Sequence, residues 1–155
     1  MTQTYEDGVQ EVVVSGLIDA DADRTWAALR DFSGLHNFAH DVVSSEIEDG
    51  WPADRIGAVR RIVLASGGVA RERLLGLSDL ERQLHYILVT PGPFPLETYS
   101  ERLRVIPVTD GDRALVEMTG AFKAPPGGSE RTRVMIRGMY EAALVGMRAW
   151  LGGRA

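Results

Sequence analysis

Glu101 is the residue of this sequence best placed to do chemistry. It interrupts an alternation of apolar residues that runs from Tyr99 through Leu103 to Val105, so in a strand its carboxyl group would share their face. A carboxyl group in such surroundings loses hydration, which raises its pKa toward a value suited to proton abstraction. The pattern therefore predicts a general base. The competing interpretation is a buried structural ion pair with an inward Arg60.

The turn Asp110-Gly111 predicts the direction in which Glu101 points. Asp-Gly favours a two-residue hairpin turn, which places Thr109 opposite Asp112 and sets the register of the two strands. On one face this register pairs Tyr99 with Phe122, Glu101 with Gly120, Leu103 with Met118, and Val105 with Val116. Since the opposite face is largely charged or polar, we expect Glu101 to point inward, with open space before it at Gly120.

Arg60 and Glu72 flank the turn at 66–68 and are candidates for contact with a ligand. A three-residue loop would pair Ile62 with Glu72 and leave Arg60 as a diagonal neighbour on the same face. A two-residue turn at Gly67-Gly68 would instead send the two side chains to opposite faces. An ion pair that fixes the hairpin is the alternative to a substrate clamp.

His40 is a candidate for proton transfer, because histidine titrates near neutral pH and could protonate a departing hydroxyl group. A solvated loop histidine is the alternative interpretation. The three histidines share no helical spacing and the chain has no cysteine, so we expect no metal site. The sequence has no phosphate-binding glycine loop or dinucleotide fingerprint, so we expect no cofactor.

Tyrosine and methionine side chains could line an apolar cavity around these groups. A buried tyrosine hydroxyl needs a protein, water or ligand partner, and methionine adapts to the shape of an apolar guest. Core packing is the alternative interpretation for each of them. The predicted catalytic residues are Glu101, Tyr99 and His40, and the predicted ligand-binding residues are Arg60, Glu72, Tyr86, Met118, Phe122, Met135, Met139 and Tyr140.

The longest helical pattern, Ser129 to Leu151, is the element around which the others must be arranged. Ser129 with Glu130 can cap its start, and Gly152 can end it. Its apolar residues recur every three or four positions and so gather on one face. They are Met135, Ile136, Met139, Tyr140, Ala143, Met147 and Trp150.

The chain before this helix reads as strands separated by turns. Strands are predicted at 9–18 and 42–48, with two short helices between them near 19–32 and 35–38. Four turn signals between 55 and 124 delimit five more strands. The order of elements predicts an α+β fold in which an antiparallel sheet carries its helices on one face.

Composition limits the classes of function. A chain of 155 residues, 45% hydrophobic, predicts one domain spanning 1–155, with a flexible polar tail at 1–8. A net charge of −5 without a basic cluster argues against nucleic acid. No apolar run approaches the roughly 20 residues of a membrane span, so we expect no membrane insertion and a cytoplasmic location. A hydrophobic small molecule is the expected partner.

Several short motifs together resemble the START-like (SRPBCC) superfamily over essentially the whole chain. The motifs are Ile18-Asp19-Ala20 leading to Trp26, Asp31-Phe32, Gly57-Ala58-Val59-Arg60, Glu72-Arg73-Leu74, the Tyr86 strand leading to Pro91-Gly92-Pro93-Phe94-Pro95, and Tyr99 followed by Leu103. Within the superfamily the chain is most similar to the bacterial polyketide cyclase/dehydrase type. The resemblance implies a helix-grip fold, in which a seven-stranded antiparallel sheet curls around the C-terminal helix, with two short helices between strands 1 and 2.

The same resemblance implies a hydrophobic cavity whose mouth is guarded by the loops 66–68 and 91–95. Asp21, Phe38, His40 and Glu101 depart from the residues common in the superfamily. A role specific to this chain could lie at these positions.

The leading hypothesis is a cavity that binds an aromatic or polyketide-like molecule and cyclises or dehydrates it, as a lyase or isomerase. Glu101 would remove a proton next to a carbonyl, Arg60 or Tyr99 would stabilise the enolate, and His40 or water would protonate the leaving oxygen. The alternative is a noncatalytic carrier or sensor of a lipid or hydrophobic metabolite, whose lining would satisfy all its polar groups internally. A third hypothesis is an interaction module of a homodimer with a filled cavity.

Overall fold

The computed structural model describes residues 8–152, so residues 1–7 of the predicted tail lie outside the described part of the chain. The strands and longer helices follow the predicted order. The strands are β1 (Gln10–Ile18), β2 (Val42–Ile47), β3 (Val59–Leu64), β4 (Val69–Ser78), β5 (Gln83–Thr90), β6 (Thr98–Val108) and β7 (Arg113–Lys123). The helices are α1 (Ala22–Leu29), α2 (Ser129–Met147), the 3₁₀ turns η1 (Leu35–Asn37) and η2 (Glu48–Gly50), and the π-helical turn η3 (Arg148–Gly152).

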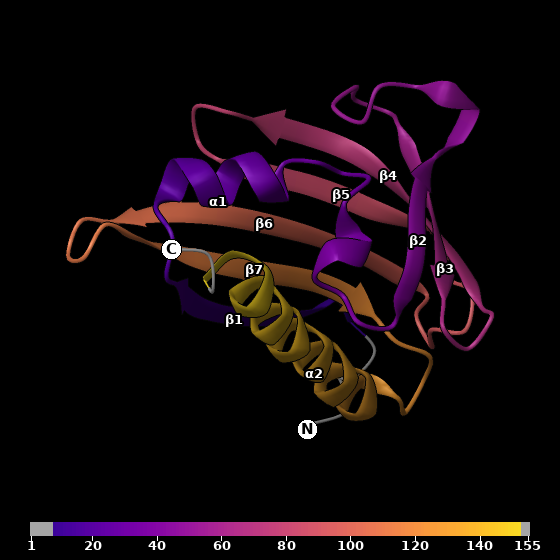
Figure 1. Ribbon diagram of the computed structural model, residues 1–155. Coiled ribbons are helices and arrows are strands. Elements are labelled where there is room, and N and C mark those ends of the chain that lie inside the picture. Colours follow the sequence, from indigo (N-terminus) through magenta and orange to yellow (C-terminus); the bar gives the residue numbers. More distant parts are fainter. Residues whose placement is uncertain (1–7, 153–155) are drawn as a thin grey trace.

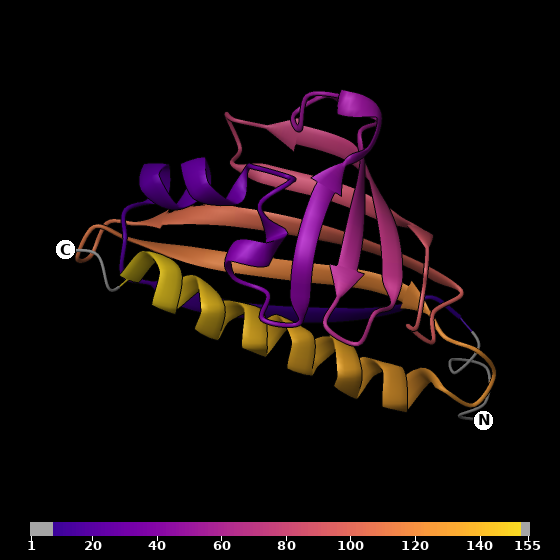
Figure 2. The same ribbon diagram turned by 45° about the vertical axis from the view of Figure 1, so that its right-hand side comes forward.

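All seven strands join one antiparallel sheet in the order β1-β7-β6-β5-β4-β3-β2. The sheet curls strongly, so that β2 and β3 stand across β6 and β7 instead of continuing alongside them (Figure 2). Helix α2 runs along the open side of this curl, and α1 and η1 lie on the same side (Figure 1). The predicted α+β fold of the helix-grip type is confirmed. Within 8–152, no helix is both long and apolar enough to cross a bilayer.

Hydrogen bonding between β6 and β7 follows the predicted register. Glu101 lies opposite Gly120 and Leu103 opposite Met118, as expected from a two-residue turn at Asp110-Gly111. Alternation along β6 then buries Glu101 on the concave face, where its exposed fraction is 6%.

The β3–β4 hairpin differs from both predicted registers. Its loop has three residues, but they are 65–67, because Leu64 N–H donates to the carbonyl of Gly68 at 2.9 Å. Gly67 takes the positive φ of 91° in this loop. Arg60 is therefore directly opposite Glu72, instead of diagonal to it or on the other face.

Helix α2 buries a face close to the predicted one. The fully buried positions include Ile136, Tyr140 and Met147, whereas Met139 is 43% exposed and lies at the edge of that face. The predicted cap at Ser129 with Glu130 is wrong: Gly128 is the N-cap and gives no side-chain hydrogen bond. The buried positions that the predicted set did not contain are Ser129, Thr132, Leu144 and Gly146.

Gly146 allows the C-terminal half of α2 to touch the segment that follows η1. A Cβ atom at this position would lie 1.9 Å from the carbonyl oxygen of Phe38, whose ring stacks on Trp150 with 6.1 Å between the ring centroids. The helix is therefore seated on the backbone at Phe38, and no side chain separates the two.

Replacing Gly146 by alanine is expected to lower the free energy of unfolding by about 1–3 kcal/mol, because the added methyl group overpacks this contact. Gly138→Ala is the matched control, since that position is on the exposed face of the same helix with no atom within 4 Å of an added Cβ. It should stabilise the protein by about 1 kcal/mol through helix propensity. Urea denaturation of both variants measures the difference, and equal effects would contradict the proposed contact.

Candidate functional site

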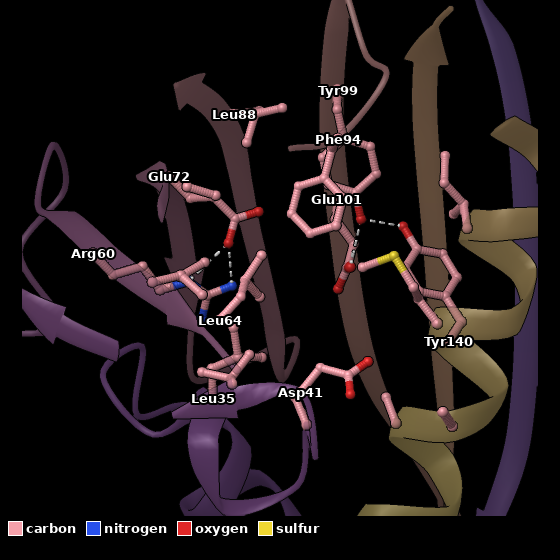
Figure 3. A pocket seen from close by; sticks show the side chains of 18 of the residues that line it. Leu35, Asp41, Arg60, Leu64, Glu72, Leu88, Phe94, Tyr99, Glu101 and Tyr140 are labelled. Carbon is pink, nitrogen blue, oxygen red and sulfur yellow. Dashed lines mark hydrogen bonds and ion pairs between the residues drawn. The ribbon is translucent and has the colours of Figure 1, made fainter. Parts of the chain in front are cut away.

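A cavity of about 600 Å³ lies between the concave face of the sheet, α2 and the segment after η1. Most of its lining is apolar, which fits a hydrophobic guest. The apolar residues around its labelled polar groups include Leu35, Leu64, Leu88 and Phe94 (Figure 3).

Two clusters of polar side chains face this cavity, and each comes from a different pair of elements. The Arg60–Glu72 pair comes from β3 and β4, while Glu101 and Tyr99 come from β6 and meet Tyr140 of α2 (Figure 3). The structure thus brings together five of the predicted site residues around one hollow.

Glu101 is held by a chain of tyrosine hydroxyl groups. The Tyr99 hydroxyl donates to Glu101 Oε1 at 2.8 Å, and the Tyr140 hydroxyl lies 2.6 Å from that of Tyr99. A hydroxyl group has one proton, so when Tyr99 donates to an ionised Glu101, Tyr140 must donate to Tyr99. The chain connects α2 to the carboxyl group on the sheet.

The space in front of Glu101 is smaller than predicted. A Cβ atom at Gly120 would lie 2.3 Å from the Tyr140 hydroxyl oxygen and 3.3 Å from the Tyr99 ring. The absence of a side chain at Gly120 therefore makes room for Tyr140. The prediction that this room is open to a ligand is wrong.

Arg60 neutralises Glu72. Its Nε and Nη2 atoms donate to Glu72 Oε1 at 2.9 and 2.7 Å, and both side chains are nearly inaccessible to solvent. The interpretation in which Arg60 pairs directly with Glu101 is not what the structure shows. The direct partners of the Glu101 carboxyl group are phenols, which cannot neutralise its charge.

Burial raises the pKa of Glu101 above its ordinary value of 4.5, and the nearby Glu72 carboxylate raises it further. Hydrogen bonds from Tyr86 and Tyr99, and the more distant charge of Arg60, oppose this rise without cancelling it. Burial and the Glu101 charge also raise the pKa values of Tyr86, Tyr99 and Tyr140. These phenols therefore remain protonated donors near neutral pH.

The raised pKa of Glu101 predicts a dependence of stability on pH. The folded protein binds this proton more tightly than the unfolded chain, so the contribution to stability is complete below pH 4.5 and is lost as pH rises through the folded-state pKa. Glu101→Gln removes this titration, so the difference in free energy of unfolding between variant and wild type should move in favour of the variant as pH rises from 4.5 through the folded-state pKa of Glu101. Urea denaturation across this range measures the difference, and a constant difference would contradict the raised pKa.

Of the remaining predicted ligand-binding residues, all but one line the cavity. Tyr86, Met118, Met135 and Met139 line the cavity. Phe122 does not: it is fully buried in the core beneath Arg133, so the structure gives no support for its predicted contact with a ligand.

His40 lies on the lining but is exposed, next to Asp41, a lining residue that was not among the predicted site residues. The Asp41 carbonyl accepts from Ala65 N–H at 2.8 Å, which holds this segment against the β3–β4 loop. Asp41 could have been predicted from the sequence, because it directly follows His40, a candidate cavity residue.

The two loops expected at the mouth lie against each other. A Cβ atom at Gly68 would lie 2.9 Å from Pro93, and one at Gly92 would lie 2.3 Å from the carbonyl oxygen of Val69. Ser66, Pro93 and Phe94 belong to the lining. A gating role for these loops stays a prediction. Within residues 8–152, no group of three or more histidine, cysteine or carboxylate side chains is placed to hold a metal ion.

Comparison with known proteins gives a family and a set of similar folds. The family described as polyketide cyclase / dehydrase and lipid transport matches residues 9–152. No curated protein matches the chain. The structure of XoxI from Bacillus cereus is similar, with a TM-score of 0.81, 23% identity, and 91% of this chain and 94% of that chain covered.

Two other solved structures are similar in the same way. An uncharacterised protein of Bacillus thuringiensis has a TM-score of 0.81 at 24% identity, with 92% of this chain and 99% of that chain covered. A protein of Thermobifida fusca has a TM-score of 0.77 at 25% identity, with 89% and 90% covered. These likenesses concern the fold.

Proposed function

Because the chain belongs to the polyketide cyclase/dehydrase and lipid transport family, in which this fold indicates binding of hydrophobic ligands, we propose that it binds an aromatic or polyketide-like molecule in its cavity and acts on that molecule by general acid–base catalysis. Glu101 is the proposed base. The observation that carries the proposal is a buried carboxyl group at the cavity whose direct partners are hydroxyl groups.

In the proposed reaction Glu101 takes a proton from the carbon next to a ligand carbonyl, and the electrons of the broken C–H bond form an enolate. Once Glu101 is protonated, it no longer needs the proton of Tyr99 as a hydrogen-bond partner. The Tyr99 hydroxyl can then donate to the enolate oxygen, while Tyr140 continues to donate to Tyr99. Arg60 is committed to Glu72, so Tyr99 is the better candidate for this role.

The enolate carbon then attacks a second carbonyl of the folded ligand, which closes a ring and leaves an alkoxide; the alkoxide takes the proton that Glu101 holds and becomes a hydroxyl group. Loss of the resulting hydroxyl group as water needs two proton transfers: Glu101 removes a second proton from the attacking carbon, and His40 or a water molecule at the cavity mouth protonates the departing oxygen. The apolar lining contributes by holding a flexible chain in a reactive pose and by excluding bulk water.

A noncatalytic carrier is the second candidate, and one observation favours it. In the described residues, every buried side-chain nitrogen and oxygen atom has a hydrogen-bond partner without any ligand. Such a lining is expected of a protein that holds its guest by apolar contact alone. The third hypothesis, a module with a filled cavity, fits poorly with a hollow of about 600 Å³.

Native mass spectrometry of freshly purified protein tests the proposal. We expect a bound hydrophobic molecule, which is then extracted, identified and incubated with fresh protein. A chemically changed product supports catalysis, and recovery of the unchanged molecule supports the carrier. If no guest is retained and the neutral probe N-phenyl-1-naphthylamine does not bind, both functions are contradicted.

A further inference from the structure

The lining of the cavity contains more acidic than basic side chains. Asp31, Asp41, Glu72 and Glu101 contribute carboxyl groups to it. In the part of the chain that the structure describes, Arg60 is the one arginine or lysine among the lining residues. Whether a guest meets a positive charge from an arginine or lysine therefore depends on whether Arg60 is free to bind it.

Arg60 is not available to a guest. Besides the two bonds to Glu72, its Nη1 atom donates to the carbonyl oxygen of Phe32 at 3.1 Å. The guanidinium carbon lies 4.2 Å from the centroid of the Phe32 ring and 4.5 Å from that of Tyr86. All three nitrogen atoms are thus hydrogen-bonded and aromatic rings contact the guanidinium group, which is 4% exposed as a residue. His40 also lines the cavity, but it is exposed, so water screens it as it screens the exposed Asp31 and Asp41.

We infer that the cavity selects uncharged or cationic hydrophobic molecules and rejects those that carry a carboxylate. The inference rests on the proposed binding function and narrows its class of ligand. A carboxylate that enters loses hydration and finds the buried, unneutralised Glu101 carboxyl group instead of a free cation. A ligand hydroxyl group avoids this cost and can donate to the hydroxyl oxygen of Tyr140, whose own proton goes to Tyr99.

A matched set of probes tests the inference. 2-Naphthalenemethanol, 2-naphthylmethylamine and 2-naphthoic acid share one ring system and differ in the charge of the head group. Their affinities are measured by displacement of N-phenyl-1-naphthylamine near neutral pH. We expect the acid to bind at least about tenfold more weakly than the alcohol, with the amine at least as tight as the alcohol. An acid that binds as tightly as the alcohol would overturn the inference.

Two further outcomes also decide the matter. If the amine is rejected as strongly as the acid, burial of any charge sets the preference, and the inference about sign is wrong. If N-phenyl-1-naphthylamine itself does not bind, the proposed function fails and the inference falls with it. The two failures are therefore distinguishable.

Glu72→Gln supplies a gain-of-function test, because it removes the charge that neutralises Arg60 while keeping the shape of the side chain. In the folded variant, verified by circular dichroism, the acid-to-alcohol affinity ratio should rise about tenfold or more, since the acid now finds an uncompensated cation. Glu81→Gln removes the same charge from an exposed turn outside the lining and should leave the ratio unchanged. If the acid-to-alcohol affinity ratio were the same in wild type and in folded Glu72→Gln, the inference that Glu72 keeps Arg60 from binding an acidic guest would be overturned.

Discussion

Replacing Arg60 by methionine is expected to lower the free energy of unfolding by about 3–5 kcal/mol, the cost typical of breaking a buried ion pair. The reason is the carboxylate that remains: Glu72 is 6% exposed and would lose both donors that bind its Oε1 atom. Packing of the guanidinium group against Phe32 and Tyr86 would be lost as well. Urea denaturation near neutral pH measures the change.

Two controls separate the buried charge from simple loss of an ion pair. The double variant Arg60→Met with Glu72→Leu should recover most of the lost stability, because an apolar pair of similar volume removes the need for compensation. Arg71→Met breaks the pair between Arg71 and Glu48, which is partly open to solvent, and should have a much smaller effect. If the double variant were as unstable as Arg60→Met, the loss of stability would come from lost packing and hydrogen bonds and not from an unpaired buried charge.

Glu101→Gln is expected to lower turnover of the cavity guest by about 100-fold to 10,000-fold, the range typical of removing a general base. Glutamine keeps the size of the side chain and can still accept a hydrogen bond from Tyr99, but it cannot take up a proton. Affinity for the guest should change little in comparison. The measurement is single-turnover conversion of the guest identified by native mass spectrometry, together with its binding constant.

Glu117→Gln is the matched control, because Glu117 lies on the adjacent strand opposite Arg104 and outside the cavity lining. Its turnover should equal that of wild type. Tyr140→Phe removes only the outer hydroxyl of the chain and should lower turnover less than Glu101→Gln does. Unchanged turnover in Glu101→Gln would show that the carboxyl group is not the base.

The inward position of Glu101 could be predicted because the information is local. A two-residue turn leaves one register for β6 and β7, and alternation along β6 then assigns each side chain to a face. The direct hydroxyl partner Tyr99 lies two residues away on the same face. Nothing distant in the sequence was needed for this part of the site.

The register of β3 and β4 could not be predicted, because two adjacent glycines leave several loops equally acceptable. The observed loop sets Gly68 against Pro93, a contact between segments that the turn itself does not specify. The same limit applies to Gly120. Its missing side chain marked a gap, but only the placement of α2 shows that Tyr140 fills it.

The close contact between Gly146 and the Phe38 backbone prevents the cavity from widening or narrowing at that end. Helix α2 cannot shift toward that segment, since there is not even room for a Cβ atom between Gly146 and the Phe38 carbonyl group. Extra volume for a larger guest must then come from another part of the lining. We expect tolerance of chemical variation in the guest to be directional, so that substituents pointing toward Phe38 are refused.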